Sequence, residues 1–193
     1  ITPLEAAKLY VKEVAEAGID CAKFQTYKAK TIVSKNSPAY WDTTKETTRT
    51  QYELFQKFDS FGKEEYKILS DYTHSLGIDF TSTPFDYESA DYLYDMVDFY
   101  KISSSDFSNL PFIKHIGAKG KPVVISVGAS YLSEVDEGIR ALKESGCKDI
   151  TILHCVLSYP TDPSNANLRI IETLKKDNKS IAIITKTDVE AAD

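Results

Sequence analysis

Two lysines lie inside segments that are otherwise apolar, where an ammonium group is uncommon. Lys23 falls within residues 20–27, and Lys101 falls within residues 99–105. Removing a charged amine from water is costly unless an anion compensates it or its pKa falls. Both lysines are therefore candidates for holding a negatively charged substrate.

Polar side chains also occur where these and other apolar segments end. They are Gln25, Thr83, Ser104, Ser126 and Tyr159. Two ammonium groups and several hydroxyl groups suit a small phosphorylated acid, because charge-assisted hydrogen bonds to phosphate oxygens are strong. Gly128, just after the segment that holds Ser126, would allow close approach of the backbone.

Two other interpretations of the lysines stay open. Each could pair with a nearby carboxylate, such as Asp86 or Asp106, and have a structural role only. A lysine at the end of a strand could also form a Schiff base with a carbonyl substrate, as in an aldolase. Asp106 would then serve as the neighbouring acid or base.

The segments that hold these residues alternate between two patterns. Short, nearly continuous apolar runs predict strands at residues 20–27, 79–85, 99–105, 122–129, 150–156 and 180–185. Apolar residues at helical spacing predict helices at residues 3–17, 63–76, 88–96, 110–118, 133–145 and 165–176.

Capping residues predict where some of these helices begin and end. Thr2 with Glu5 indicates the start of the first helix, and Ser133 with Asp136 indicates the start of helix 133–145. Glycines follow three of the helices and predict their ends: Gly18, Gly77 and Gly146.

The alternation predicts an α/β fold of parallel βαβ units with right-handed crossovers. A doubly wound sheet and a (β/α)₈ TIM barrel both fit, but no Gly-rich fingerprint follows the first strand, which disfavours a dinucleotide site. Polar residues at the carboxyl ends of the strands favour the barrel. About six strands cannot close a barrel that usually takes about 250 residues. We therefore expect an incomplete barrel, a single partial domain over residues 1–193.

Residues 28–60 form too long a stretch for a simple connection. The stretch includes Tyr40, Trp41 and Arg49. A lid or substrate-binding loop and an excursion that packs against the side of the barrel are both open interpretations.

Charge and composition argue against several classes. A net charge of −6 disfavours nucleic acid or an anionic membrane as the main partner. No apolar run approaches the roughly 20 residues of a membrane span, and the three cysteines have no metal or disulfide spacing. We expect a reducing, cytoplasmic compartment. Because the chain starts at Ile1 rather than Met, we also expect an excerpt of a longer protein.

The three histidines are scattered and predict no metal site in this chain. His74 and His115 fall on predicted helices, and His154 falls in a predicted strand. With no second ligand beside it, His154 is better interpreted as a hydrogen-bonded core residue than as a metal ligand.

Several blocks, in order along the chain, resemble the sialic acid synthase family. They are Lys-Phe-Gln-Thr at 23–26, Ser-Thr-Pro-Phe at 82–85, Tyr-Lys-Ile-Ser at 100–103, Gly-Lys-Pro-Val at 120–123 and His-Cys-Val-Leu-Ser-Tyr-Pro-Thr at 154–161. The likeness extends to about Lys176. The family includes N-acetylneuraminate, legionaminate and pseudaminate synthases and spore coat polysaccharide proteins.

The resemblance implies a TIM barrel that condenses phosphoenolpyruvate with an N-acylated mannosamine-type sugar, giving a nonulosonic acid and phosphate. Lys23, Lys101 and Asp106 are the implied catalytic residues. At matching positions, the residues that would hold phosphoenolpyruvate are Lys23, Thr83, Lys101, Ser104 and Ser126. Those that would face the sugar are Gln25, Asp106 and Tyr159.

The resemblance also implies Mn²⁺ or Mg²⁺, a homodimer and a C-terminal antifreeze-like domain. The family's catalytic Glu lies upstream of Ile1, and residues 181–188 lack the usual His-containing block. We therefore expect the metal ligands and the antifreeze-like domain to be absent from this chain, and the chain alone to be inactive. A degenerate barrel that acts as a non-catalytic scaffold remains an alternative.

Overall fold

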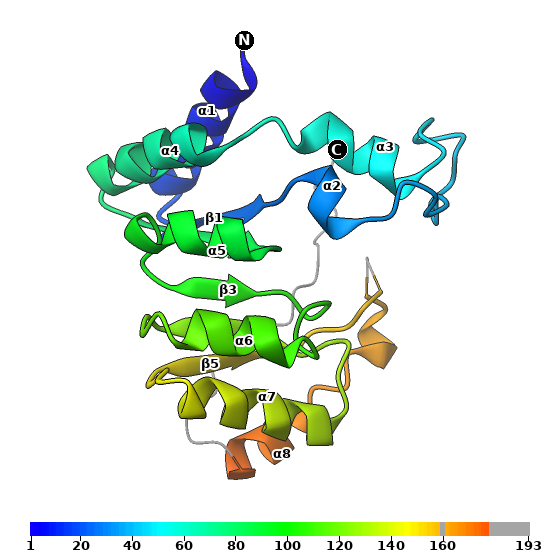
Figure 1. The fold of residues 1–193 in the computed structure, drawn as a ribbon, viewed down its shortest axis with the longest axis vertical. Helices are drawn as coiled ribbons and strands as arrows, with labels where there is room; N and C mark the ends of the chain where they lie inside the picture. Colours follow the sequence, from blue (N-terminus) through cyan, green and yellow to red (C-terminus); the bar gives the residue numbers. More distant parts are fainter. Residues whose placement is uncertain (159–160, 178–193) are drawn as a thin grey trace. The chain divides into compact units, whose positions relative to one another are not determined.

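The computed structural model describes residues 1–158 and 161–177, with helices and strands in alternation (Figure 1). The chain divides into two compact units, Ile1–Asp98 and Phe99–Asp193. This organisation confirms the predicted α/β class, whereas the incomplete TIM barrel stays a prediction.

The first unit contains a two-stranded parallel sheet. Strand β1 (Cys21–Thr26) pairs with β2 (Asp79–Pro84), which places Lys23 beside Thr81 and Gln25 beside Thr83. The helices of this unit are α1 (Pro3–Glu16), α2 (Ala29–Ile32), α3 (Gln51–Phe58), α4 (Lys63–Ser75), α5 (Tyr87–Tyr92) and the 3₁₀ turn η1 (Leu93–Asp95).

The core of the first unit forms where α1 and α4 pack side by side and α4 meets β2 (Figure 1). Val11 of α1, Leu69 of α4 and Phe80 of β2 are buried. The predicted start of α1 is confirmed, because the Thr2 hydroxyl accepts from the Glu5 amide and the Glu5 carboxylate accepts from the Thr2 amide.

The second unit contains a three-stranded parallel sheet in the order β3–β4–β5. Its elements are β3 (Tyr100–Ile102), α6 (Leu110–Gly117), β4 (Val123–Ser126), α7 (Leu132–Glu144), β5 (Ile150–Leu153), the 3₁₀ turn η2 (Pro163–Asn165) and α8 (Ile170–Asp177). Alternate residues of β4 and β5 are buried and half-buried, so one face of these strands belongs to the core and the other carries Ser126.

Some predicted boundaries were wrong. Helix α7 begins at Leu132 rather than Ser133, because the Glu134 carboxylate accepts from the Tyr131 amide at 2.7 Å. The strand predicted at residues 99–105 ends at Ile102, where a turn begins. The helix predicted from residue 165 begins at Ile170, because Pro163–Asn165 form a 3₁₀ turn.

The predicted helix ends at three glycines are confirmed, whereas other predicted elements have different outcomes. Gly18, Gly77 and Gly146 have φ of 78°, 78° and 110°, which confirms the left-handed ends of three helices. The strand predicted at residues 180–185 lies outside the described residues. Helices α2 and α3 were not predicted within residues 28–60.

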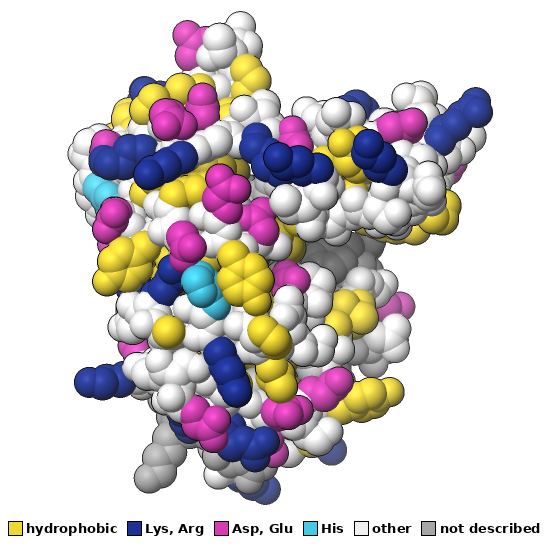
Figure 2. All heavy atoms as spheres, in the orientation of Figure 1, with side chains coloured by type: hydrophobic (Ala, Val, Ile, Leu, Met, Phe, Trp, Pro, Cys, Tyr) yellow, Lys and Arg dark blue, Asp and Glu magenta, His cyan; other side chains and the backbone are white. Residues whose placement is uncertain are grey.

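The described surface is mixed in charge. Figure 2 shows cationic and anionic side chains interspersed over the face that it draws. Within residues 1–158 and 161–177, no helix combines the length and the hydropathy needed to cross a bilayer.

Candidate functional site

The second unit brings two of the predicted site residues together on neighbouring strands. The Lys101 Nζ atom donates to the Ser126 hydroxyl at 2.6 Å and to the Ile102 carbonyl at 2.7 Å. Lys101 pairs in register with Val124, so Ser126, two residues further on, lies on the same face. Lys101 is 9% exposed, which confirms that its ammonium group is largely removed from water.

A short turn follows β3 and carries two more of the predicted residues, Ser104 and Asp106. The Ser103 carbonyl accepts from the Asp106 amide at 3.2 Å, and the Ser105 hydroxyl donates to the Ser103 hydroxyl at 3.0 Å. Burial raises the pKa of Asp106, although a hydrogen bond from Ser105 partly opposes this. The turn therefore places a carboxyl group of raised proton affinity shortly after Lys101.

The loops after β4 and β5 approach each other closely at Gly128. A Cβ atom at this position would lie 2.9 Å from both the carbonyl oxygen and the Sγ atom of Cys155. Gly128 therefore does allow a close approach, and the atoms that approach it are the backbone carbonyl and the thiol of Cys155.

His154, next to that contact, has a structural role. Its Nε2 atom lies 2.8 Å from the Ala166 carbonyl, and the residue is 9% exposed. This confirms the prediction of a hydrogen-bonded core histidine. Tyr159, predicted to face the sugar, lies outside the described residues.

The first unit carries the other three predicted site residues on one face of its sheet. Gln25 and Thr83 are side by side in the β1–β2 register, and Lys23 shares their face two residues earlier. Thr83 is buried, whereas Lys23 and Gln25 are exposed. The prediction that Lys23 is buried was wrong, because β1 alternates and its buried positions are Ala22 and Thr26.

The carboxyl end of β1 is held by groups that sequence reasoning did not assign to the site. The Tyr66 hydroxyl, from α4, donates to the Gln25 carbonyl at 2.7 Å. Burial raises the pKa of Tyr66 to about 12. Thr26 and Ser82 form a buried hydroxyl pair at 2.7 Å. Tyr66 lies within the helix predicted at residues 63–76, and no sequence pattern connected its hydroxyl with β1.

Asp86, the other carboxylate that could have paired with a lysine, has helix-capping and loop contacts. It accepts from the Ser89 amide at 2.7 Å, at the start of α5, and from the Thr31 hydroxyl at 2.9 Å. These contacts assign Asp86 a structural role at the start of α5.

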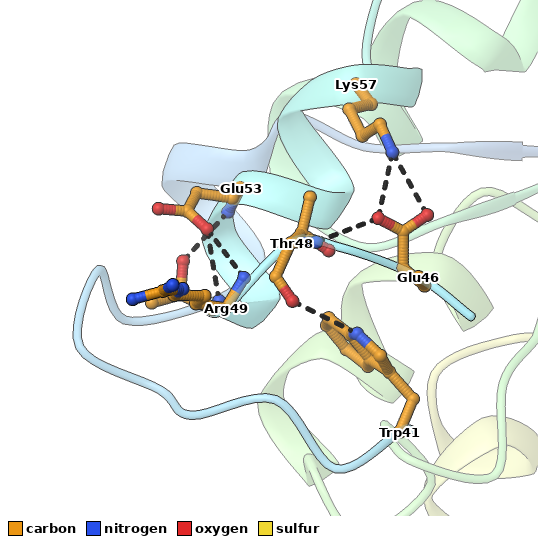
Figure 3. Close-up of polar contacts among 7 residues, drawn as sticks. Trp41, Glu46, Thr48, Arg49, Glu53 and Lys57 are labelled. Atoms are coloured by element: carbon orange, nitrogen blue, oxygen red, sulfur yellow. Dashed lines mark hydrogen bonds and ion pairs between the residues drawn. The ribbon is translucent and has the colours of Figure 1, made fainter. Parts of the chain in front are cut away.

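Within residues 28–60, the loop between α2 and α3 is held by a network of hydrogen bonds (Figure 3). The Trp41 indole donates to the Thr48 carbonyl at 3.2 Å. The Glu46 carboxylate accepts from the Thr48 amide at 3.0 Å and from Lys57 at 2.9 Å, and these bonds lower its pKa to about 2. Tyr40 is 78% exposed beside this network. The lid and excursion hypotheses both remain predictions.

Within residues 1–158 and 161–177, no three His, Cys, Asp or Glu side chains gather closely enough to hold an ion. Cys21, Cys147 and Cys155 are free thiols, and burial raises the pKa of Cys21 to about 11.

The chain is similar to several synthases. N,N'-diacetyllegionaminic acid synthase of Legionella pneumophila is 35% identical over 178 residues, which cover 89% of this chain and 50% of that protein. The crystal structure of N-acetylneuraminic acid (sialic acid) synthetase from Leptospira borgpetersenii superposes with a TM-score of 0.81 at 30% identity, over 93% of this chain and 59% of that chain.

A more distant likeness concerns the fold alone. The truncated form of 3-deoxy-D-arabino-heptulosonate 7-phosphate synthase from Thermotoga maritima superposes with a TM-score of 0.68 at 12% identity, over 95% of this chain and 59% of that chain.

The chain spans about half the length of the curated relatives that it matches. The model of the NeuB family matches residues 10–183, which is most of the sequence. The chain therefore belongs to the NeuB family.

Proposed function

We propose that the protein containing this chain condenses phosphoenolpyruvate with an N-acylated mannosamine-type sugar, giving a nonulosonic acid and phosphate. The observation that carries the proposal is the Lys101–Ser126 contact at 2.6 Å at the carboxyl ends of β3 and β4. In a (β/α)₈ barrel, which we propose as the complete fold, active sites lie at that end of the strands.

The donors in the second unit suit an anionic substrate. Lys101 supplies a largely buried positive charge, and Ser126 accepts from it while keeping its own proton to donate. Such fixed donors stabilise charge on a phosphate or carboxylate more strongly than water does, because they need not reorganise during the reaction. Ser104 would add a further hydroxyl from the adjacent turn. The family resemblance also assigns Lys23 and Thr83 to phosphoenolpyruvate, and both assignments stay predictions.

The proposed bond changes follow from the two substrates. The methylene carbon of phosphoenolpyruvate attacks the aldehyde carbon of the open-chain sugar, and the aldehyde oxygen takes up a proton to become a hydroxyl. The carbon that carries the phosphate is left cationic, and water adds to it with loss of a proton. Phosphate then leaves by cleavage of its C–O bond, and the new hydroxyl loses its proton to give the ketone. Gln25, Asp106 and Tyr159 are the proposed contacts to the sugar, and Asp106 is suited to hold a proton because burial raises its pKa.

The family implies Mn²⁺ or Mg²⁺, but the described residues do not fit such a site, since they bring no three candidate ligands together. We propose that the ligands, an antifreeze-like domain and a homodimer partner belong to the complete protein, in the cytoplasm. The 193-residue chain alone is then expected to show no turnover.

Phosphate release by the full-length protein tests the proposal. The protein is given phosphoenolpyruvate, Mn²⁺ and a panel of N-acylated mannosamines and bacillosamine-derived sugars. Release that depends on one sugar supports the synthase and identifies its substrate. Phosphate release that does not need a sugar contradicts the proposal. Absence of phosphate release with every sugar of the panel also contradicts it.

A trapping experiment distinguishes the aldolase alternative. The full-length protein is treated with borohydride in the presence of pyruvate and analysed by peptide mass spectrometry. The synthase predicts no adduct, whereas a stable adduct on Lys101 or Lys23 would show Schiff-base chemistry. Absence of both adduct and phosphate release would favour the scaffold.

A further inference from the structure

Phe107 directly follows Asp106 and is completely buried. Its ring lies against Gly138 in the middle of α7. A Cβ atom at Gly138 would be 2.3 Å from the Phe107 Cζ atom and 2.6 Å from its Cε2 atom, much closer than non-bonded carbons approach. The ring therefore occupies the space that a side chain at position 138 would need.

Hydrogen bonds also connect the turn at residues 103–109, which contains Phe107, to the start of α6. The Asp106 amide donates to the Ser103 carbonyl at 3.2 Å, and the Asp106 carbonyl accepts from the Asn109 amide at 2.9 Å. Asn109 in turn caps α6, because its side-chain oxygen accepts from the Phe112 amide at 3.4 Å. Asp106 takes part in two of these hydrogen bonds, and Ser104 lies between Ser103 and Asp106 in the turn.

We propose that Phe107, seated against Gly138, is a positioning residue that sets the place of Ser104 and Asp106. The inference rests on the proposed function, which assigns Ser104 to phosphoenolpyruvate and Asp106 to the sugar. Side chains on a loop reach productive geometry only when packing beneath them fixes the backbone. A buried aromatic ring with two side-chain torsions is a rigid anchor of this kind.

The same helix pair contains a matched control. Gly117 of α6 also packs against α7, and a Cβ atom there would lie 3.0 Å from the Ser145 Cβ atom and 3.2 Å from the Leu142 carbonyl oxygen. Gly117→Ala therefore crowds the same pair of helices, and the three atoms nearest to the new methyl group belong to Ser145 and Leu142 rather than to Phe107. A general loss of stability would appear in both alanine variants, whereas a displaced turn would appear only in Gly138→Ala.

The experiment uses the full-length protein and the variants Gly138→Ala, Gly117→Ala, Phe107→Leu and the double variant Gly138→Ala/Phe107→Leu. Amide hydrogen exchange is measured across residues 103–109, together with kcat and KM for phosphoenolpyruvate. We expect Gly138→Ala to accelerate exchange in this peptide and to lower kcat/KM by roughly ten- to hundredfold, as small misplacements of catalytic groups do. Gly117→Ala should change neither.

The double variant provides the decisive comparison, because leucine leaves room for the new methyl group. Recovery of slow exchange and of KM in the double variant supports the inference. Equal behaviour of Gly138→Ala and Gly117→Ala, or no recovery in the double variant, overturns it. If the unmodified protein does not use phosphoenolpyruvate, the proposed function fails, while the exchange pattern still decides whether Phe107 positions the turn.

Discussion

The Nζ atom of Lys101 lies 2.6 Å from the hydroxyl oxygen of Ser126, although 25 positions separate the two residues in the sequence. Parallel pairing of β3 with β4 produces this contact, since both side chains lie on the same face of the sheet. The pair gives the proposed site a cation and a hydroxyl whose relative position is set by the strands themselves.

Replacing Lys101 with alanine should weaken the use of phosphoenolpyruvate. In the full-length protein, we expect Lys101→Ala to raise KM for phosphoenolpyruvate and to lower kcat, with a loss of roughly a hundredfold or more in kcat/KM. Steady-state phosphate release measures both constants. Lys148→Ala, at an exposed position of the same unit, is the control and should leave them unchanged. Unaltered kinetics in Lys101→Ala would remove Lys101 from the site.

Ser126 should act together with Lys101 rather than independently. We expect Ser126→Ala to lower kcat/KM by about tenfold, because the hydroxyl accepts from Lys101 and keeps a proton that it can donate to the substrate. Once Lys101 is already alanine, the same change should cost much less, as expected for residues that share one interaction. A double-mutant cycle on kcat/KM measures the coupling, and strict additivity would argue that the 2.6 Å contact has no catalytic consequence.

Tyr66→Phe should destabilise the protein by about 1–3 kcal/mol, because it leaves the Gln25 carbonyl without its donor. The pKa of Tyr66 is raised from 10.0 to about 12. Its contribution to stability is therefore complete below pH 10 and is lost as the pH rises toward 12. Urea unfolding between pH 8 and about 12 should show a smaller decline for Tyr66→Phe than for the unmodified protein.

The control for this prediction is Tyr10→Phe, whose parent residue is exposed on α1. It should unfold like the unmodified protein at every pH. A KM for the sugar that rises in Tyr66→Phe but not in Tyr10→Phe would connect the hydrogen bond to the placement of Gln25.

Asp106→Asn should stabilise the fold at neutral pH while reducing turnover. Burial raises the folded-state pKa of Asp106 above its ordinary value of 3.8. The carboxyl group therefore favours the folded state fully only below pH 3.8, and this advantage is lost as the pH rises through the folded-state pKa. The neutral amide avoids that loss, so the stability of Asp106→Asn relative to the parent should increase from acid to neutral pH in urea unfolding. A constant difference would contradict the raised pKa.

Glu46→Gln should loosen the network around Trp41. The pKa of Glu46 is lowered from 4.5 to about 2, so its stabilising bonds are present above pH 4.5 and are lost as the pH falls toward 2. Trp41 is the single tryptophan of this sequence, and its fluorescence reports the change. We expect greater acrylamide quenching in Glu46→Gln at neutral pH, after subtraction of a Trp41→Phe background. Glu64→Gln, on the exposed surface of α4, should leave quenching unchanged.

Features set by local sequence patterns were predicted better than features set by contacts between distant parts of the chain. The strands around Lys23 and Lys101 were predicted because a buried parallel strand is an apolar run of a few residues. The burial of Lys23 was predicted wrongly, because an apolar run does not show which face of a strand is covered. Helix α3 was missed because its side chains are exposed or half-buried and lack a buried stripe.

The contacts that position the candidate site could not be predicted from sequence patterns, because they join residues on different elements. The Lys101–Ser126 contact depends on the register between two strands, which periodicity within one strand does not determine. The seat of Phe107 at Gly138 depends on shape complementarity between a turn and a helix. Roles assigned by family resemblance to Lys23, Gln25, Thr83 and Ser104 stay predictions.

The order of residues along β3 has a consequence for how the sequence can change over generations. Tyr100 and Ile102 are core residues, and Lys101 lies between them. Lys101 is itself buried, but its ammonium group meets the Ser126 hydroxyl rather than apolar side chains. An insertion or deletion of one residue here would exchange the faces of Lys101 and its neighbours, which would place an ammonium group in the apolar core and disfavour folding. Selection for folding alone therefore preserves the alternation of side chains between the two faces of β3 around Lys101. A substitution at position 101, in contrast, can remove the ammonium group without changing this alternation.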